Sequence, residues 1–356
     1  MFKKLETSNS TFVSFVCPRI NDLKYPSKYS KPEELTHFSY DKTRELHLNS
    51  TKSLNIFNDR PLPIDLNTGY PNKFIERDPK PEHIDALLKS IEDIQTNPQF
   101  CTWRGIFTKI ITTPYCPRDD WQLGATLYNG TIYLEEHESI DKINSKFGSN
   151  ESHKLFMYYG YKFEEEFTKS FGQDSSDDVG IVNTNVQYCS VFKSKLGTHE
   201  VVLGGEVDCI LRPPKDNEQI SSLYAELKTH RVIETPQQKN SFHRFKLLKT
   251  WAQSYLAGVP NIIFGFRDDV GTLQSIKHWK TDDLPRIAKS ENLWDRHVCL
   301  NFGTKVLDFL KQNITVDDKN VVYTIKYDSR QREISIYGSG EDSELKFVRD
   351  WYRNTN

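Results

Sequence analysis

Three carboxylates and one lysine lie within one short stretch of the chain. Glu206 and Asp208 are separated by a single residue, and so are Glu226 and Lys228. Residues two apart in a β-strand project from the same face, so each pair can present its charges to one side. Residues 212–218 between the pairs are typical of a turn, with two prolines that do not fit a central strand. If the flanking strands pair as a hairpin, all four charged groups converge on one patch.

A patch of this composition suits phosphoryl chemistry. Hard divalent cations such as Mg²⁺ and Mn²⁺ prefer carboxylate and carbonyl oxygens. Two such ions about 3.5–4 Å apart can stabilise the attacking and the leaving oxygen of a displacement at phosphorus. A nearby lysine can orient the attacking water or help to remove its proton. An ordinary cross-strand ion pair is the commoner explanation of Glu and Lys on neighbouring strands. The apolar residues that alternate with the charges favour a buried site instead.

Bulk properties restrict the function only loosely. The chain has 356 residues, a net charge of −2 and 37% hydrophobic residues. A nucleic-acid partner would therefore have to meet a local basic surface. Six cysteines without any C-x-x-C spacing argue against a zinc site. No apolar run approaches the roughly 20 residues that span a bilayer, so we expect an intracellular protein without membrane contact.

The elements that must position the acidic residues are readable from periodicity. Patterns of alternation and of apolar runs predict strands at 11–17, 100–111, 121–127, 131–135, 179–191, 200–211, 223–227, 261–266 and 272–279, and a hairpin around 321–337. Apolar residues three or four apart predict helices at 83–95, 152–172, 241–257 and 304–312. Asn129-Gly130 indicates a tight hairpin turn. Gly160 inside a helix costs about 1 kcal/mol relative to Ala, so we expect another segment to approach closely there.

The chain contains no internal repeat, linker or low-complexity segment, so we expect one domain over residues 1–356. Residues 1–100 would act mainly as scaffold, and residues 101–280 would carry the chemistry. Residues 281–356 would add a C-terminal helix and a hairpin.

Five motifs, taken in order, give the chain a specific resemblance. They are Trp103-Arg-Gly, Gly160-Tyr-Lys-Phe-Glu, Gly205-Glu-Val-Asp, Glu226-Leu-Lys and Trp251-Ala-Gln. In this order and spacing they resemble the DXO family of RNA 5′-end decapping nucleases, which includes the fungal partner of the nuclear 5′-to-3′ exoribonuclease. The resemblance implies an α+β fold of two twisted mixed β-sheets flanked by helices, with a PD-(D/E)XK nuclease-like core.

The resemblance also implies roles for individual side chains. The metal ions, Mg²⁺ or Mn²⁺ and two in number, would be held by Glu164, Glu206, Asp208, Glu226 and the carbonyl of Leu227. Catalysis would fall to Lys228, which positions the attacking water, together with Glu226, Asp208 and Gln253. Substrate near the scissile phosphate would be contacted by Arg104, Glu164, Lys228 and Gln253.

By the same resemblance the protein is a metal-dependent RNA 5′-end hydrolase. Its substrates would be RNA 5′ ends that carry a triphosphate, an unmethylated cap or an NAD cap. It would release pyrophosphate from the triphosphate end, and it would remove the unmethylated cap and the NAD cap. Some family members are also 5′-to-3′ exonucleases. Analogy places it in the nucleus, with the cytoplasm as the alternative, and suggests a nuclear 5′-to-3′ exoribonuclease as partner. Two alternatives stay open: a protein that mainly stabilises such an exoribonuclease, and a DNA nuclease of the same superfamily.

Two features have an equally simple structural explanation. Glu164 begins the run Glu164-Glu-Glu, and a charge run on a helix is usually a solvated face. A basic cluster follows the acidic motif and can either track an RNA backbone or be ordinary surface. It consists of Arg231, Lys239, His243, Arg244, Lys246 and Lys249.

Overall fold

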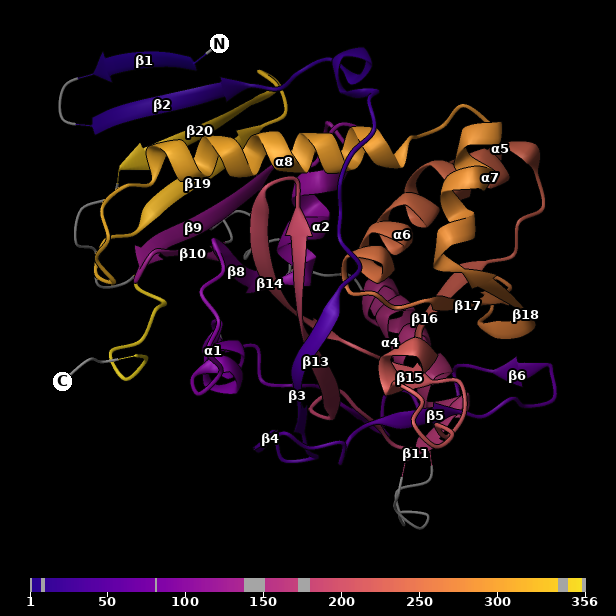
Figure 1. The fold of residues 1–356 in the computed structure, drawn as a ribbon. Coiled ribbons are helices and arrows are strands. Elements are labelled where there is room, and N and C mark those ends of the chain that lie inside the picture. The colour runs from indigo at the N-terminus through magenta and orange to yellow at the C-terminus, as the bar shows by residue number, and fades with distance from the viewer. Residues whose placement is uncertain are drawn as a thin grey trace.

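The structure is a computed structural model that describes residues 2–7, 10–80, 82–137, 151–171, 180–338 and 345–353 (Figure 1). Its strands are β1 (Phe2–Thr7), β2 (Ser10–Val16), β3 (Glu33–Tyr40), β4 (Leu46–Leu48), β5 (Asn55–Phe57), β6 (Ile64–Asp65), β7 (Phe74–Ile75), β8 (Phe100–Trp103), β9 (Trp121–Tyr128), β10 (Thr131–Glu136), β11 (Thr168–Ser170), β12 (Val182–Asn183), β13 (Gln187–Leu196), β14 (His199–Glu206), β15 (Cys209–Ile210), β16 (Tyr224–Arg231), β17 (Asn261–Arg267), β18 (Thr272–Lys280), β19 (Tyr323–Asp328) and β20 (Glu333–Gly338). Its helices are α1 (Asp85–Ile91), α2 (Arg104–Thr112), α4 (Glu151–Glu166), α5 (Pro236–Ser241), α6 (Leu247–Leu256), α7 (Leu284–Ser290) and α8 (Arg296–Asn313), with shorter turns at η1 (Ile20–Leu23), η2 (Ile220–Leu223), η3 (Phe242–Lys246) and η4 (Thr281–Asp283).

Most strands belong to two mixed sheets, as expected. The 11-stranded sheet has the order β1-β2-β20-β19-β9-β10-β8-β14-β13-β3-β4, and the 7-stranded sheet has the order β11-β5-β15-β16-β17-β18-β6. Parallel pairs occur at β8–β10 and β8–β14 in the first sheet, and at β5–β15 and β16–β17 in the second. The larger sheet occupies the left of Figure 1 and the smaller one the lower right. The α+β fold class is therefore confirmed.

One hydrophobic core connects the two sheets. It contains Phe107 of α2, Trp251 of α6 and Leu307 of α8. It also contains Leu203 of β14 and Phe264 of β17, which belong to different sheets. Helices α2, α6 and α8 thereby fix the position of one sheet relative to the other. None of the helices in the described ranges is long and apolar enough to cross a membrane.

The two faces of the 7-stranded sheet have different roles. Leu227 packs with Phe163 of α4 in one cluster, so α4 covers that face. Glu226 and Lys228 point to the opposite face, because neighbouring residues in a strand alternate. In β17 their partners are Ile262 and Phe264, which pack in the same core as α6. The charged pair of β16 therefore lies on the face that α6 covers.

The predicted strand at 100–111 is half wrong. Strand β8 ends at Trp103, and helix α2 begins at Arg104. The apolar run after this point suits either a strand or a helix, and its length does not decide between them. In the structure Ile106 and Ile110 are buried one helical turn apart. Arg104 therefore stands at a helix start, where its side chain can turn back towards the sheet.

The predicted strand at 200–211 is two strands in different sheets. Strand β14 ends at Glu206 in the larger sheet, and β15 starts at Cys209 in the smaller one. The chain crosses between sheets at Val207, whose amide donates to the Tyr188 carbonyl. The expected hairpin exists only as a short one, with Cys209 and Ile210 of β15 paired antiparallel to β16.

Several other boundaries differ from expectation. Helix α4 ends at Glu166, and the expected end at residue 172 lies outside the described residues. In the described part of the chain no segment approaches Gly160 closely, since an added Cβ would meet no atom within 4 Å. The expected helix at 241–257 begins earlier, with a capping box between Thr235 and Gln238, and contains the π-helical turn η3. The hairpin at Asn129 is confirmed, with positive φ at it and the next residue.

Candidate active site

The crossover between the sheets brings the two acidic motifs together. Continuing the β15–β16 register places Asp208 opposite Glu226. The Asp208 Oδ2 accepts a hydrogen bond of 2.6 Å from the backbone amide of Leu227. Strand β15 pairs only through residues 209 and 210, so this carboxylate takes the place of a strand neighbour on β16. The structure thus brings the predicted carboxylates together, although it does so through a sheet crossover and not through a long hairpin.

Glu226 lies at the centre of the charges, with 2% of its side chain exposed. Its Oε2 is 3.1 Å from Arg104 Nη1, and its Oε1 is in direct contact with the Lys228 ammonium. Lys228 Nζ is also 3.9 Å from Asp208 Oδ2 and donates to the Leu227 carbonyl at 3.1 Å. Asp208, Glu226 and Lys228 therefore form one connected cluster.

Arg104 is a buried member of this cluster and not a surface cation. Its Nη1 donates to Glu226 and, at 3.3 Å, to the carbonyl of Glu206. Gly205 permits this position, because a Cβ there would stand 3.2–3.3 Å from the arginine side chain. In the motif Gly205-Glu-Val-Asp, the glycine therefore leaves room for the arginine side chain, and the two acids contribute to the cluster.

Glu164 on helix α4 lies close enough to the cluster to be affected by its charges, and its pKa is raised well above the usual range. Burial is the largest cause, and the charge of Asp208 is the next. Lys228 partly offsets both effects. The alternative explanation of Glu164, a solvated helix face, is therefore wrong. Glu165 and Glu166 instead pair with the buried Lys162.

The other carboxyl groups show how crowded the site is. Burial and the charge of Glu226 raise the pKa of Asp208 to about 7. Burial also raises the pKa of Glu206, against the opposing effect of Arg104. Glu226 behaves differently: burial opposes its ionisation, but Lys228 and Arg104 outweigh burial and lower its pKa to about 2. One ionised carboxylate is thus held by two cations, and the remaining acids lack enough positive charge.

This donor set fits divalent metal ions. Glu164, Glu206, Asp208 and Glu226 supply carboxylate oxygens, while Leu227 supplies a carbonyl oxygen. Such hard donors are the ligands that Mg²⁺ and Mn²⁺ prefer. Positive charge added among the acids would also lower the raised pKa values described above.

Gln253 lies half-buried on α6, the helix that covers the face of Glu226 and Lys228. In the described part of the chain, no hydrogen bond joins its side chain to the cluster. Its neighbour Trp251 is fully buried and packs against Tyr255 and Trp294. Trp251 anchors the helix, and the substrate contact of Gln253 stays a prediction.

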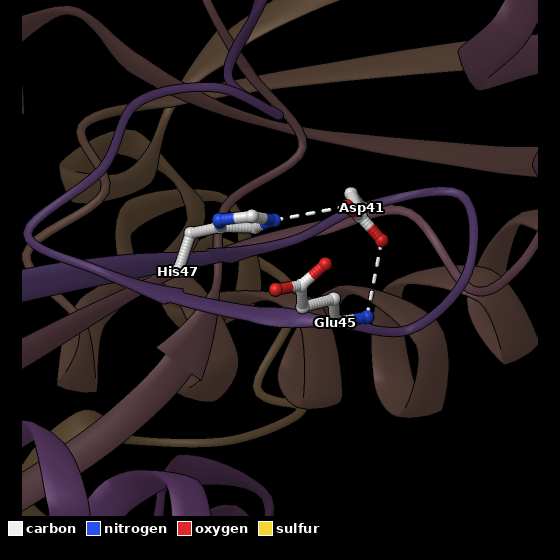
Figure 2. Close-up of side chains that lie close together, drawn as sticks. All are labelled: Asp41, Glu45 and His47. Carbon is white, nitrogen blue, oxygen red and sulfur yellow. Dashed lines mark hydrogen bonds and ion pairs between the residues drawn. The ribbon is translucent and has the colours of Figure 1, made fainter.

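A second group of possible metal ligands lies at the turn between β3 and β4. Asp41, Glu45 and His47 place one ligand atom each within 4.8 Å of one another. Figure 2 shows the Asp41 carboxylate between the His47 ring and the Glu45 amide. Asp41 also accepts from Thr43, and the Lys52 ammonium lies 3.3 Å from its Oδ2. Turn hydrogen bonds and a lysine already satisfy this carboxylate, so the group has a structural explanation.

The geometry agrees with what comparison to known proteins finds. The family model described as "RAI1 like PD-(D/E)XK nuclease" matches residues 30–353. The chain belongs to this family. The mouse decapping and exoribonuclease protein is 35% identical over 344 residues, which cover 92% of this chain and 85% of the mouse protein.

Solved structures of family members have the same fold. S. pombe Rai1 superposes with a TM-score of 0.76 at 30% identity, over 92% of this chain and 100% of that one. Candida albicans Rai1, solved in complex with pU5 and Mn²⁺, gives a TM-score of 0.81 at 27% identity, over 94% of this chain and 95% of that one. The chain is therefore a PD-(D/E)XK nuclease.

Proposed function

We propose that this protein is a metal-dependent hydrolase of RNA 5′ ends. It removes incomplete or non-standard caps, including NAD caps, and releases pyrophosphate from 5′-triphosphate RNA. The observation that carries the proposal is the buried cluster at the sheet crossover, where Asp208, Glu226 and Lys228 are joined through the backbone of Leu227. The names of the relatives support RNA 5′ ends as the substrate class.

The residues divide the work according to their positions. Glu164, Glu206, Asp208, Glu226 and the Leu227 carbonyl would hold one or two divalent ions. When bound, these ions neutralise charge that develops on the attacking and leaving oxygens. Burial disfavours the charged form of Lys228, but Glu226 and Asp208 more than compensate and raise its pKa. Lys228 Nζ therefore carries its proton at neutral pH and can donate to the attacking water.

Arg104 acts mainly by holding Glu226. Its guanidinium joins that carboxylate to the end of β14, so the acids from both sheets keep one arrangement. A planar guanidinium can also present donors to a phosphate. Gln253 extends the polar surface on α6, and we propose that it contacts substrate beside the scissile phosphate.

A panel of RNA substrates tests the function. RNAs with a 5′ triphosphate, a 5′ monophosphate, a guanosine cap or an NAD cap are incubated with the protein and Mg²⁺ or Mn²⁺. We expect release of pyrophosphate or of the cap. We expect no release with a chelator or with the double variant Asp208→Asn, Glu226→Gln. Equal products from wild type and variant would show that the cluster is not the active site. Cutting of duplex DNA without action on these RNAs would favour a DNA nuclease.

We further propose that the protein acts in the nucleus and that it degrades the RNA body 5′-to-3′ after the end is removed. Binding to a 5′-to-3′ exoribonuclease is expected from the same resemblance. Localisation of a fluorescent fusion, ladder analysis of 3′-labelled 5′-monophosphate RNA, and co-purification with the exoribonuclease test these points separately.

A further inference from the structure

A concave feature lies near the cluster, on the side of η3 and α6. It is a cavity of about 380 Å³ lined mainly by His230, Gln238, Phe242, Phe245, Lys246 and Lys249. His230 stands two residues after Lys228 on β16, so both share one face of the strand. The cavity therefore begins one step along the strand from the proposed active site.

Most cations of the basic cluster after the acidic motif are neutralised by acids. Arg231 pairs with Asp269 at 2.7 Å, and Lys249 pairs with Asp119 at 2.8 Å. Glu291 pairs with both Lys239, at 3.1 Å, and His243, at 2.6 Å. These residues are accounted for by structure, and a role in tracking RNA is not needed to explain them.

Lys246 is different. It is half-buried in the cavity wall, and its ammonium has no ion pair or hydrogen bond with any residue in the described ranges. Burial, together with the nearby charge of Lys228, lowers its pKa to about 8. A partly buried cation without a counter-ion costs free energy that a bound anion would recover. The position of Lys246 next to a phosphoryl site makes a phosphate the natural anion.

An exposed aromatic ring stands beside this ammonium. Phe245 has 42% of its surface exposed, although it is a large apolar residue in a helical segment. Arg244 lies over its ring, with 5.2 Å between the guanidinium carbon and the ring centre. A cation and an exposed aromatic ring in one groove are the features with which proteins bind single-stranded nucleic acid.

The π-helical turn η3 sets this arrangement. It spans Phe242–Lys246, and such turns are frequent at functional sites. Phe242 is buried against His230, with 4.5 Å between their ring centres, so the turn is fixed to β16. An extra residue in a helical turn rotates all later side chains of the helix by about 100°. The turn therefore decides which side chains of this helix face the cavity.

We infer that this cavity binds the RNA body on the 3′ side of the scissile phosphate, with a base stacked on Phe245 and a backbone phosphate on Lys246. The inference rests on the proposed function. Gln253 and Lys246 are seven residues apart, which is roughly 10 Å along a helix, a span that one or two nucleotides can bridge. Lys249 and Phe245 in the cavity wall are exposed, so the cavity is open to solvent on that side. A longer RNA chain can therefore continue out of the cavity. An RNA body requires such an exit, whereas a cap nucleotide does not.

The test compares Lys246→Ala, Lys246→Arg and Phe245→Ala with wild type on two single-stranded RNAs of one sequence. One RNA carries a 5′ triphosphate, which has no nucleotide on the leaving side, and the other carries an NAD cap. Lys239→Ala is the matched control, because that lysine is on the same helical segment but pairs with Glu291. Hydrolysis with Mn²⁺ gives KM and kcat, and fluorescence anisotropy in EDTA gives the affinity for the same RNA without turnover.

We expect Phe245→Ala to raise KM for both RNAs by about 5-fold to 150-fold, which corresponds to the loss of one stacked base. Lys246→Ala should weaken binding and reduce the slope of log affinity against log salt by about 0.7, for one phosphate contact on a single strand. Lys246→Arg should restore most of the loss, and Lys239→Ala should behave as wild type.

Two results would overturn the inference while leaving the proposed function intact. One is a wild-type level of binding and KM in both Lys246→Ala and Phe245→Ala. The other is a defect confined to the NAD-capped RNA, which would place the cap nucleotide in the cavity. A wild type that hydrolyses neither RNA would instead refute the proposed function, and the inference would fall with it.

Discussion

Replacement of Arg104 by methionine removes one of two cations from a carboxylate that is almost completely buried. The ion pair with Glu226 spans 3.1 Å, and the two side chains are 10% and 2% exposed. Loss of one partner from such a pair costs about 3–5 kcal/mol, because the remaining charge stays buried without compensation. That loss corresponds to roughly two to four powers of ten in the unfolding equilibrium constant.

Arg349→Met provides the control for this experiment. Arg349 pairs with Asp85 at the same distance of 3.1 Å, but the side chains are 39% and 31% exposed. An exposed pair contributes about 0–1 kcal/mol. Urea unfolding in EDTA, followed by tryptophan fluorescence, gives the free energy of unfolding for wild type and both variants. Mn²⁺ should recover more stability in Arg104→Met than in wild type, because the variant has more uncompensated negative charge. Equal destabilisation by the two variants would refute the reasoning from burial.

Three further predictions concern the titration of Asp208, the space around two glycines, and the acidic group at Asp41. The raised pKa of Asp208, about 7, means that the folded protein binds a proton that the unfolded chain releases. Its contribution to stability in EDTA should therefore fall as pH rises from about 4 to 7, and urea unfolding of Asp208→Asn should show a weaker decline. Gly160→Ala should raise the free energy of unfolding by about 0.5–1 kcal/mol, whereas Gly204→Ala should lower it, because its Cβ would stand 2.7 Å from the Trp103 ring. Asp41→Asn should leave Mn²⁺ binding measured by calorimetry unchanged, because turn hydrogen bonds and Lys52 already satisfy that carboxylate.

The sequence contains enough to predict the chemistry of the site but not its construction. Glu-x-Asp and Glu-x-Lys can be read as pairs on one face, because alternation along a strand is a local property. No local pattern shows that the chain passes from one sheet to the other between Glu206 and Cys209, since strand partners are set by contacts between distant residues. The pattern around Arg104 predicts a strand because an apolar run fits both periodicities, and only burial against α6 and α8 selects the helix.

The cavity next to η3 shows more clearly what cannot be predicted from the sequence. Lys246 is one of six basic residues after the motif, with no feature in the sequence to separate it from the others. That it has no counter-ion among the described residues appears only when the acids that pair with its neighbours, such as Glu291 and Asp119, are brought close from distant parts of the chain. In the sequence only the motif Gly160-Tyr-Lys-Phe-Glu singles out Glu164. The run of three glutamates by itself does not indicate which one points inward.

The hydrogen bond from the Leu227 amide to Asp208 also has a consequence for handling the protein. Strand β15 is short, so this carboxylate, and not a neighbouring strand, accepts from a buried amide of β16. A buried donor that loses its acceptor costs about 1–3 kcal/mol. A substitution at Asp208 that removes the hydrogen-bond acceptor should therefore destabilise the fold as well as change the acidic cluster. The folded fraction of such variants should therefore be measured before a loss of activity is attributed to chemistry.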